Sequence, residues 1–321
     1  METNIVMFMT IGVFVVVFSI VIIVLAAVGT FSSKDEPVIV TKLPCTNEVA
    51  FTQRGVIQGS FASHVYASPD MGVLFALTND GHYVIFRSSD TYKQVQMLIE
   101  DVPLTPYCVV LDRQCVFASD TRLIKYDYSD TGKLSDRHVL DGVHVTGEMR
   151  SVTETSFSVL VDNNLIQRYD SNLQLKQSIP VANVVAHSCF GELTAVATSS
   201  AEVRIYRSIE NVHVIVGVVA SDMTFDVYGN LIIVNESTMY VYDSESFALL
   251  HTQDGGDKVQ SLGNYLFVSN NLTMSAYDYF RLTQRFDTGA CKNFVVGYRN
   301  NDLILITCHS SALDVYNSAC I

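Results

Sequence analysis

The sequence predicts an all-β fold of seven repeated four-stranded units, preceded by one transmembrane α-helix. Two observations predict it. The first is an uncharged apolar run near the N-terminus, Ile5 to Val28. The second is a short pattern that recurs along the rest of the chain: an apolar strand, a polar turn, and a second strand that ends in an aromatic residue. The clearest copy is Leu231 to Asp243, which reads Leu-Ile-Ile-Val-Asn-Glu-Ser-Thr-Met-Tyr-Val-Tyr-Asp.

The aromatic residue that ends this pattern occurs seven times at a nearly constant spacing. Successive copies of this marker are 35 to 43 residues apart. A fixed period of this length indicates a repeat architecture, in which each repeat packs against its neighbours. The markers are Phe86, Tyr126, Tyr169, Tyr206, Tyr242, Tyr277 and Tyr316.

The repeat around Tyr277 shows how four strands fit into one period. We expect an inner strand at 257–262, an apolar strand at 265–270, the marker strand at 273–277 and an outer strand at 282–286. The second strands are almost continuously apolar, which predicts burial on both faces. Four antiparallel strands per period form the blade of a β-propeller, so seven markers predict a seven-bladed β-propeller.

The two ends of the repeat region are incomplete in complementary ways. Only five residues follow Tyr316, so the seventh repeat has strands at 293–298, 303–307 and 313–316 but no outer strand. The first full inner strand starts near Phe61, which leaves residues 48–57 without a place in the first blade. We therefore expect residues 48–57 to supply the missing outer strand and to close the ring, because this pairing removes an exposed sheet edge.

The apolar run at Ile5 to Val28 is 24 residues long, more than the ~20 residues that cross a bilayer core. A cleavable signal peptide is the alternative, but no basic segment precedes the run and the run is long for such a peptide. Small residues around Ala26 keep cleavage open. The predicted organisation is a tail at 1–4, a transmembrane helix at 5–28, a juxtamembrane linker at 29–47 and the propeller at 48–321.

The prediction of the side of the membrane on which the propeller lies rests on few charges. Lys34 and Lys42 follow the apolar run, whereas the tail before it has neither Lys nor Arg. Cationic residues flanking a span favour the cytosol, which predicts a cytosolic propeller. Two N-glycosylation sequons, at Asn235 and Asn271, favour the opposite side and leave glycosylation open.

Composition excludes some classes of protein. The formal net charge is -13 and Lys and Arg are not clustered, which argues against a nucleic-acid partner, since phosphate binding requires concentrated positive charge. Seven cysteines with no CxxC motif do not form a disulfide scaffold. Most are expected as small apolar residues in strands. Cys108 and Cys115 fall on two strands of one predicted hairpin, so one disulfide between them stays open.

The sequence holds no convincing catalytic or metal-binding motif. His138 and His144 are the closest histidine pair, but a metal site needs a third ligand near them. The segment 127–132 lacks the acidic positions of a calcium loop and is expected to be a turn. Cys308 and His309 are adjacent in a predicted strand and therefore point to opposite faces. The prediction is that the chain has no catalytic residue, no cofactor and no metal site.

The strand order and the period resemble the WD40-like and quinoprotein-like propeller superfamilies over residues 49–321. Tyr-Asp pairs stand where WD40 blades carry Trp-Asp, and the chain has no Trp. The resemblance implies that the aromatic ring fills the wedge between neighbouring sheets and that the acid accepts hydrogen bonds in a turn. The Gly-His of WD40 blades and the motifs of propeller enzymes are absent. The Tyr-Asp pairs lie at 126–127, 169–170, 242–243 and 277–278.

Together these features predict a single-pass membrane protein whose propeller is a non-enzymatic protein-interaction or structural scaffold. The expected partners are the lipid bilayer, through Ile5 to Val28, and one or more proteins on the propeller loops. A structural protein of a viral envelope or internal virion membrane is the first alternative. An enzyme or small-ligand binder that uses the central channel is the second.

Overall fold

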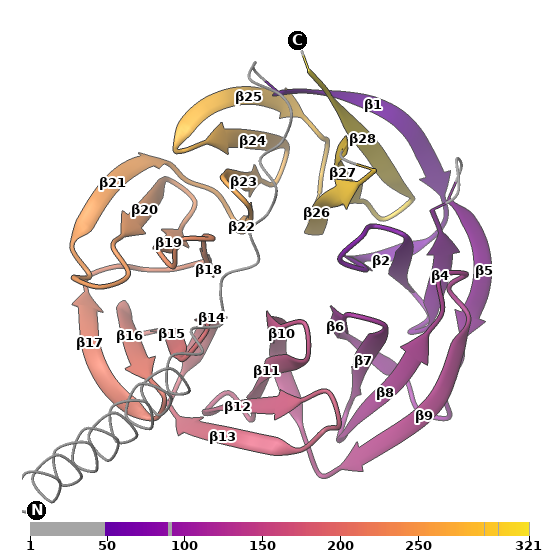
Figure 1. The fold of residues 1–321 in the computed structure, drawn as a ribbon, viewed down its shortest axis with the longest axis horizontal. Helices are drawn as coiled ribbons and strands as arrows, with labels where there is room; N and C mark the ends of the chain where they lie inside the picture. Colours follow the sequence, from indigo (N-terminus) through magenta and orange to yellow (C-terminus); the bar gives the residue numbers. More distant parts are fainter. Residues whose placement is uncertain (1–48, 89–91, 292, 301, 321) are drawn as a thin grey trace, which may run out of the picture. The chain divides into compact units, whose positions relative to one another are not determined.

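The computed structural model of the chain describes residues 49–88, 92–291, 293–300 and 302–320. In this part the chain forms 28 strands in seven four-stranded antiparallel sheets, which stand around a central axis as the blades of a propeller (Figure 1). The seven-bladed all-β prediction is therefore confirmed. The predicted tail, transmembrane helix and linker lie outside the described residues. Among the residues that are described, no helix is long and apolar enough to cross a bilayer.

The strands of each blade follow one another from the axis outward, except in blade 7. Blades 1 to 3 consist of β2 (Phe61–Ala67), β3 (Val73–Thr78), β4 (Tyr83–Arg87) and β5 (Lys93–Leu98); β6 (Leu104–Leu111), β7 (Gln114–Ser119), β8 (Arg122–Tyr128) and β9 (Leu134–Asp141); and β10 (Val145–Thr153), β11 (Ser156–Val161), β12 (Leu165–Asp170) and β13 (Leu175–Pro180).

The remaining blades repeat this order with shorter strands in blade 5. Blades 4 to 6 consist of β14 (Val184–Phe190), β15 (Leu193–Thr198), β16 (Glu202–Arg207) and β17 (Glu210–Val216); β18 (Asp222–Phe225), β19 (Leu231–Val234), β20 (Thr238–Tyr242) and β21 (Leu249–Asp254); and β22 (Lys258–Leu262), β23 (Tyr265–Asn270), β24 (Thr273–Asp278) and β25 (Arg281–Asp287). Blade 7 consists of β26 (Asn293–Arg299), β27 (Asp302–Cys308), β28 (Ala312–Cys320) and β1 (Val49–Gln58).

The hydrophobic core is divided into seven clusters, and each cluster lies between two neighbouring blades. Between blades 5 and 6, for example, Ile232 and Val241 pack against Val259 and Leu266. The second strands supply both faces to these clusters, so that all four residues of β19 are buried. This is the two-sided burial that their continuous apolar sequence predicts.

The aromatic markers lie on the third strand of every blade and contact the cluster shared with the preceding blade. Tyr169 of blade 3 packs in the cluster with blade 2, Tyr242 of blade 5 in that with blade 4, and Tyr316 of blade 7 in that with blade 6. The predicted role as a wedge between sheets is confirmed. It follows physically because a radial sheet leaves a widening gap toward the rim, and a large ring fills that gap.

The acids after the markers act in turns at some positions and not at others. Asp170 Oδ1 accepts hydrogen bonds from the backbone N–H groups of Asn172 and Gln174, both at 2.9 Å. Asp243 Oδ1 accepts in the same way from the N–H of Ser246 at 2.7 Å. At Asp127 the prediction is wrong for one oxygen, because the buried Oδ1 has no hydrogen-bond partner among the described residues.

The ring is closed by strands from its two ends. β1 pairs antiparallel with β28 from Val49 opposite Cys320 to Gln58 opposite Ala312, with one register shift. Phe51 of β1 is buried and packs edge-on against Phe267 of blade 6, with ring centroids 5.7 Å apart. The predicted closure by residues 48–57 is confirmed in the described strand, and the closing strand also enters a core cluster.

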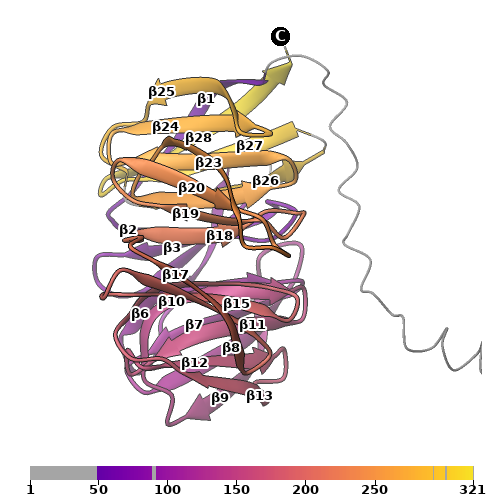
Figure 2. The same cartoon turned by 90° about the vertical axis from the view of Figure 1, so that its left-hand side faces the viewer.

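The strand directions give the propeller two distinct faces. We call the face where each inner strand begins the start face, and the face where each inner strand ends the end face. Asn235 and Asn271 follow second strands and therefore lie in loops of the start face. The paired residues Val49 and Cys320 lie at the end face, which is on the right in Figure 2.

The disulfide left open between Cys108 and Cys115 is not formed. Both thiols are free and buried. Cys108 lies opposite Phe117 and Cys115 lies opposite Val110, so the two cysteines are two positions out of register. Three more described cysteines, Cys189, Cys291 and Cys308, are also free and buried, as expected for small apolar core residues.

The β1–β28 pairing makes a testable contribution to stability. A chain that begins at Phe61 lacks β1, and we expect it to melt at a lower temperature than a chain that begins at Lys34. The loss exceeds that of an ordinary outer strand, because it uncovers Phe51's neighbours between blades 6 and 7 as well as one edge of β28. Each apolar side chain exposed again costs roughly 1.5–3 kcal/mol. Thermal unfolding followed by circular dichroism measures the difference, and equal melting temperatures would contradict the closure.

Candidate functional site: a charged network in the central channel

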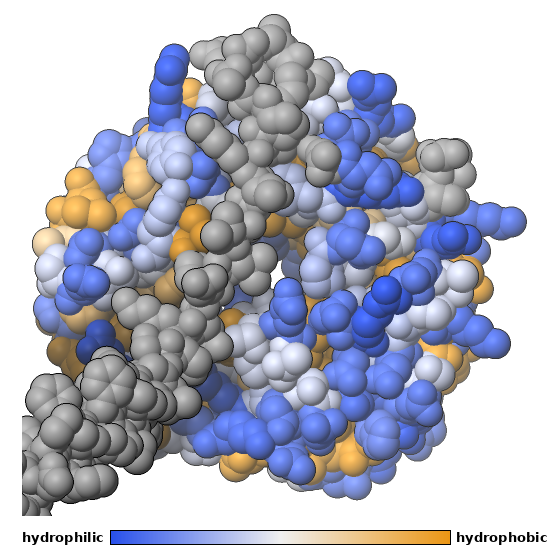
Figure 3. Space-filling model, in the orientation of Figure 1, coloured by the Kyte–Doolittle hydropathy of each residue, from blue (hydrophilic) through white to orange (hydrophobic). Residues whose placement is uncertain are grey.

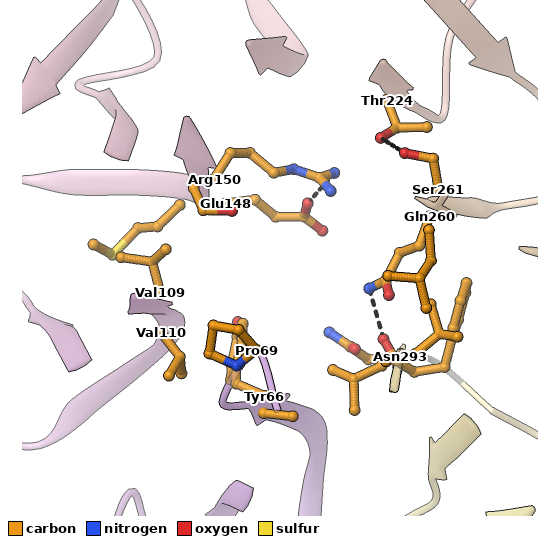
Figure 4. Close-up of a pocket in the computed structure, with 18 of the residues that line it drawn as sticks. Tyr66, Pro69, Val109, Val110, Glu148, Arg150, Thr224, Gln260, Ser261 and Asn293 are labelled. Carbon is orange, nitrogen blue, oxygen red and sulfur yellow. Dashed lines mark hydrogen bonds and ion pairs between the residues drawn. The ribbon is translucent and has the colours of Figure 1, made fainter. Parts of the chain in front are cut away.

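A cavity of about 480 Å³ runs along the propeller axis (Figure 4). Its lining comes from the inner strand or adjoining loop of every blade. Most of the lining is apolar or carries hydroxyl and amide groups, as at Val109, Ser188, Thr224 and Gln260. Four charged side chains stand out against this lining: Glu148, Arg150, Asp222 and Lys258.

Irregular inner strands place part of this lining. In β2, β6 and β10 the register shifts so that four residues of the inner strand span the length of two on its neighbour. The bulge of β10 lies between Val145 and Met149 and contains Glu148. Gly147 permits it, because a Cβ atom there would approach Leu160 Cδ2 to 2.7 Å. Bulges re-aim side chains, and here the carboxylate of Glu148 points into the channel (Figure 4).

The bulges also bond neighbouring blades to each other. The hydroxyl of Tyr66 on β2 donates to the carbonyl of Pro106 in the bulge of β6. The hydroxyl of Tyr107 on β6 donates to the carbonyl of Thr146 in the bulge of β10, at 3.2 Å. Carbonyls released from the sheet ladder are thereby satisfied, which buried backbone groups require.

The four charged side chains form one network across the channel. Arg150 Nη2 contacts a carboxylate oxygen of Glu148 and donates to Asp222 Oδ1, while Lys258 Nζ donates to Glu148 Oε1. Asp222 also accepts from the backbone N–H groups of Met223 at 2.9 Å and Val259 at 3.0 Å. The network therefore ties the inner strands of blades 3, 5 and 6 together.

Burial and charge act against each other in this network. Burial opposes ionisation of Glu148, but Arg150 and Lys258 outweigh it and lower the pKa of Glu148 to about 2. For Asp222 burial is the largest influence and raises the pKa, while Arg150 and Lys258 oppose that shift. Removing one member would leave an unpaired buried charge, which is strongly unfavourable.

A buried Ser-His pair lies beside the network, between blades 3 and 4. His187 Nε2 lies 3.0 Å from Ser158 Oγ, and Cys189 Sγ lies 3.4 Å from the same oxygen. Burial and then the charge of Arg150 lower the pKa of His187 to about 3, so the ring is neutral. The exposed fractions of Ser158 and His187 are only 0% and 2%. A substrate in the channel cannot reach this pair, which joins two blades.

The motifs singled out in the sequence lie away from the channel. His144 contacts Asp162 at 2.8 Å and Asp120 at 3.6 Å on the surface. Among the described residues, no group of three His, Cys, Asp or Glu side chains is arranged so that it could hold a metal ion. The segment 127–132 contains a turn in which Gly132 N donates to Ser129 O, as predicted. Cys308 is fully buried while His309 is partly exposed, consistent with side chains on opposite faces.

Sequence reasoning missed the charged network. Its members come from three strands separated by long stretches of chain, so no local spacing signals it. One sign was present: Glu148 and Arg150 are two positions apart in an inner strand, and alternate residues of a strand point to the same side.

The rim of the propeller provides a second surface of interest. Five of the seven outer strands carry Lys or Arg, which discourage pairing with another chain. The neighbouring strands β17 and β21 carry neither. We call these two strands, with the exposed apolar residues in them and beside β17, the apolar rim. Hydrophobic residues, shown in orange, occupy part of this edge on the left of Figure 3. The exposed residues are Ile209, Val212, Val214, Val216, Val219, Leu249 and Leu250.

The comparisons with protein families and with curated proteins find no relative of this chain. No protein-family model matches it, and no curated protein is similar enough to count as a match. The class that the structure defines is a seven-bladed β-propeller with four-stranded blades.

The energetic role of the network can be measured by substitution. Asp222→Ala removes an acceptor for Arg150 and for two backbone N–H groups, so we expect a loss of about 3–5 kcal/mol in the free energy of unfolding. Asp254→Ala is the matched control, because Asp254 forms a surface pair with Arg285 at 2.8 Å. Exposed pairs contribute below about 1 kcal/mol. Urea unfolding measures both, and equal losses would show that the network does not tie the blades.

Proposed function

We propose that this protein is a non-enzymatic interaction propeller, held at a membrane by Ile5 to Val28, and that its protein partner binds the apolar rim. The observation that carries the proposal is the absence of Lys, Arg and Pro from β17 and β21, two neighbouring outer strands that also expose apolar side chains. The Tyr-Asp positions on the third strands support grouping the chain with the WD40-like propellers.

The chemistry of the rim indicates what kind of segment it fits. β17 pairs only with β16 in the described chain, so its outer edge offers backbone N–H and C=O groups. Val212, Val214 and Val216 expose side chains at alternate positions of the strand. Asn211 to Ala220 contains no charged residue, although the net charge is -13. An extended partner segment with apolar residues at alternate positions satisfies both features by adding a strand.

The proposal of a membrane tether rests on the sequence. The uncharged run at 5–28 is long enough to span a bilayer, and Lys34 and Lys42 favour the cytosolic side for the propeller. The chain enters the propeller at the end face, through Val49. The sequons at Asn235 and Asn271 lie on the start face, so under the opposite topology both glycans would sit on the side away from this entrance.

A charge placed on the rim tests the partner site. Val214→Lys places a cation among the exposed apolar side chains of β17, which should discourage pairing with a partner strand. We expect the amount of partner recovered by chemical cross-linking and affinity purification from native membranes to fall at least tenfold. Val95→Lys is the control, because Val95 is exposed to a similar degree, 46% against 38%, on β5, which already carries Lys93.

The comparison of the two variants decides the outcome. Loss of the same protein in Val214→Lys and its retention in Val95→Lys support the rim as the site. Equal recovery from both variants, or loss only in Val95→Lys, would place the partner elsewhere and refute the proposal.

The tether is tested by removing it. A chain lacking Met1 to Ser33 retains β1, so we expect a folded propeller that stays in the supernatant after a carbonate wash, while the full chain pellets with membranes. Circular dichroism confirms folding of the shortened chain. If the shortened chain pelleted to the same extent, the apolar run would not be the anchor.

A further inference from the structure

The channel network has unused hydrogen-bond donors but few unused acceptors. Both oxygens of Asp222 accept hydrogen bonds, and Glu148 contacts Lys258 and Arg150. The cations are less fully used. Lys258 has three N–H donors and bonds Glu148, while Arg150 makes its contacts through Nη2, and its buried Nε has no partner among the described residues.

The four charges of the channel balance formally, but they are not equally exposed. The side chain of Asp222 is only 3% exposed, whereas those of Arg150, Lys258 and Glu148 are 20%, 31% and 34% exposed. Two cations and one anion thus present more surface to the cavity than Asp222, the second anion of the lining. Arg150 and Lys258 already contact one carboxylate, that of Glu148, so their spacing suits the bridging geometry of a carboxyl group. A second carboxylate from the channel side would accept hydrogen bonds from the exposed N–H groups of these two cations.

The rest of the cavity offers apolar surface between hydroxyl and amide groups. Phe190 borders the cavity and forms an aromatic pair with Phe225, a buried member of the core cluster between blades 4 and 5, with ring centroids 5.9 Å apart. Val109 and Leu262 add further apolar surface. A volume of about 480 Å³ lies in the range of small-molecule sites, and the lining combines apolar side chains with hydroxyl and amide groups.

We propose that the channel binds a small carboxylic acid with an apolar or aromatic body, whose carboxylate lies on Arg150 and Lys258 and whose body packs against Phe190 and Phe225. The site is separate from the apolar rim, and the inference stands whether or not a protein binds there.

The probe for this site is 4-phenylbutanoate, and 4-phenylbutan-1-ol is its uncharged counterpart. Titration calorimetry on the full chain in mild detergent is expected to show at least tenfold tighter binding of the acid than of the alcohol. Lys258→Met should weaken the acid at least tenfold and leave the alcohol unchanged. Lys176→Met is the matched control, because Lys176 pairs with Asp170 on the surface, and it should bind both compounds as the unaltered chain does.

A variant that keeps all four charges guards against loss of folding. Val296→Phe adds volume in the channel lining, and it should weaken both compounds while the protein stays folded. The proposal is overturned if the unaltered chain shows no binding of the acid at concentrations up to about 10 mM, because the binding free energy is then weaker than about 3 kcal/mol. Equal binding of acid and alcohol overturns it as well, and so does unchanged acid binding in folded Lys258→Met or Val296→Phe.

Discussion

The propeller depends on one constraint: among the described residues, no blade contains a hydrophobic core of its own. Each of the seven clusters draws its residues from two neighbouring sheets, because a single four-stranded sheet cannot bury both of its faces. Every blade therefore needs two neighbours. The two end blades of an open row would each lack one, so the row has to close into a ring. The aromatic markers such as Tyr242 and the closing strand β1 both serve this requirement, one by filling the wedges and the other by completing blade 7.

The channel meets a different requirement. The inner strands converge there, and apolar side chains alone could line it. Instead the chain places Arg150 and Asp222 in a largely buried pair and adds Glu148 and Lys258. Such groups are no more stabilising than well-packed apolar residues in many proteins, so rigidity of the ring is an incomplete account of them. The unused donors of the two cations are consistent with a role in recognition.

The parts of the structure that the sequence predicts are those with local, repeated signals. The apolar second strands and the markers recur within short windows, so the blade count and the strand order could be read directly. The closure of the ring could be predicted by counting the strands of each blade, since residues 48–57 had no place in blade 1. The network could not be read in this way, because Glu148, Asp222 and Lys258 come from three blades, and a bulge that re-aims Glu148 has no signature in a single sequence. The rim is visible only once the outer strands are known.

The pairing of β1 with β28 also sets an order of events during synthesis. The strand that completes blade 7 is the first part of the propeller to leave the ribosome, and its partner is the last. At roughly 5–20 residues per second the interval between them is on the order of tens of seconds. During that time the flank of blade 1 that later packs on blade 7, with Phe61, Leu74 and Phe86, has nothing to cover it. The nascent chain therefore carries an exposed apolar flank until translation of the ring is complete, and a cell that makes this protein has to shield it from other chains for that long.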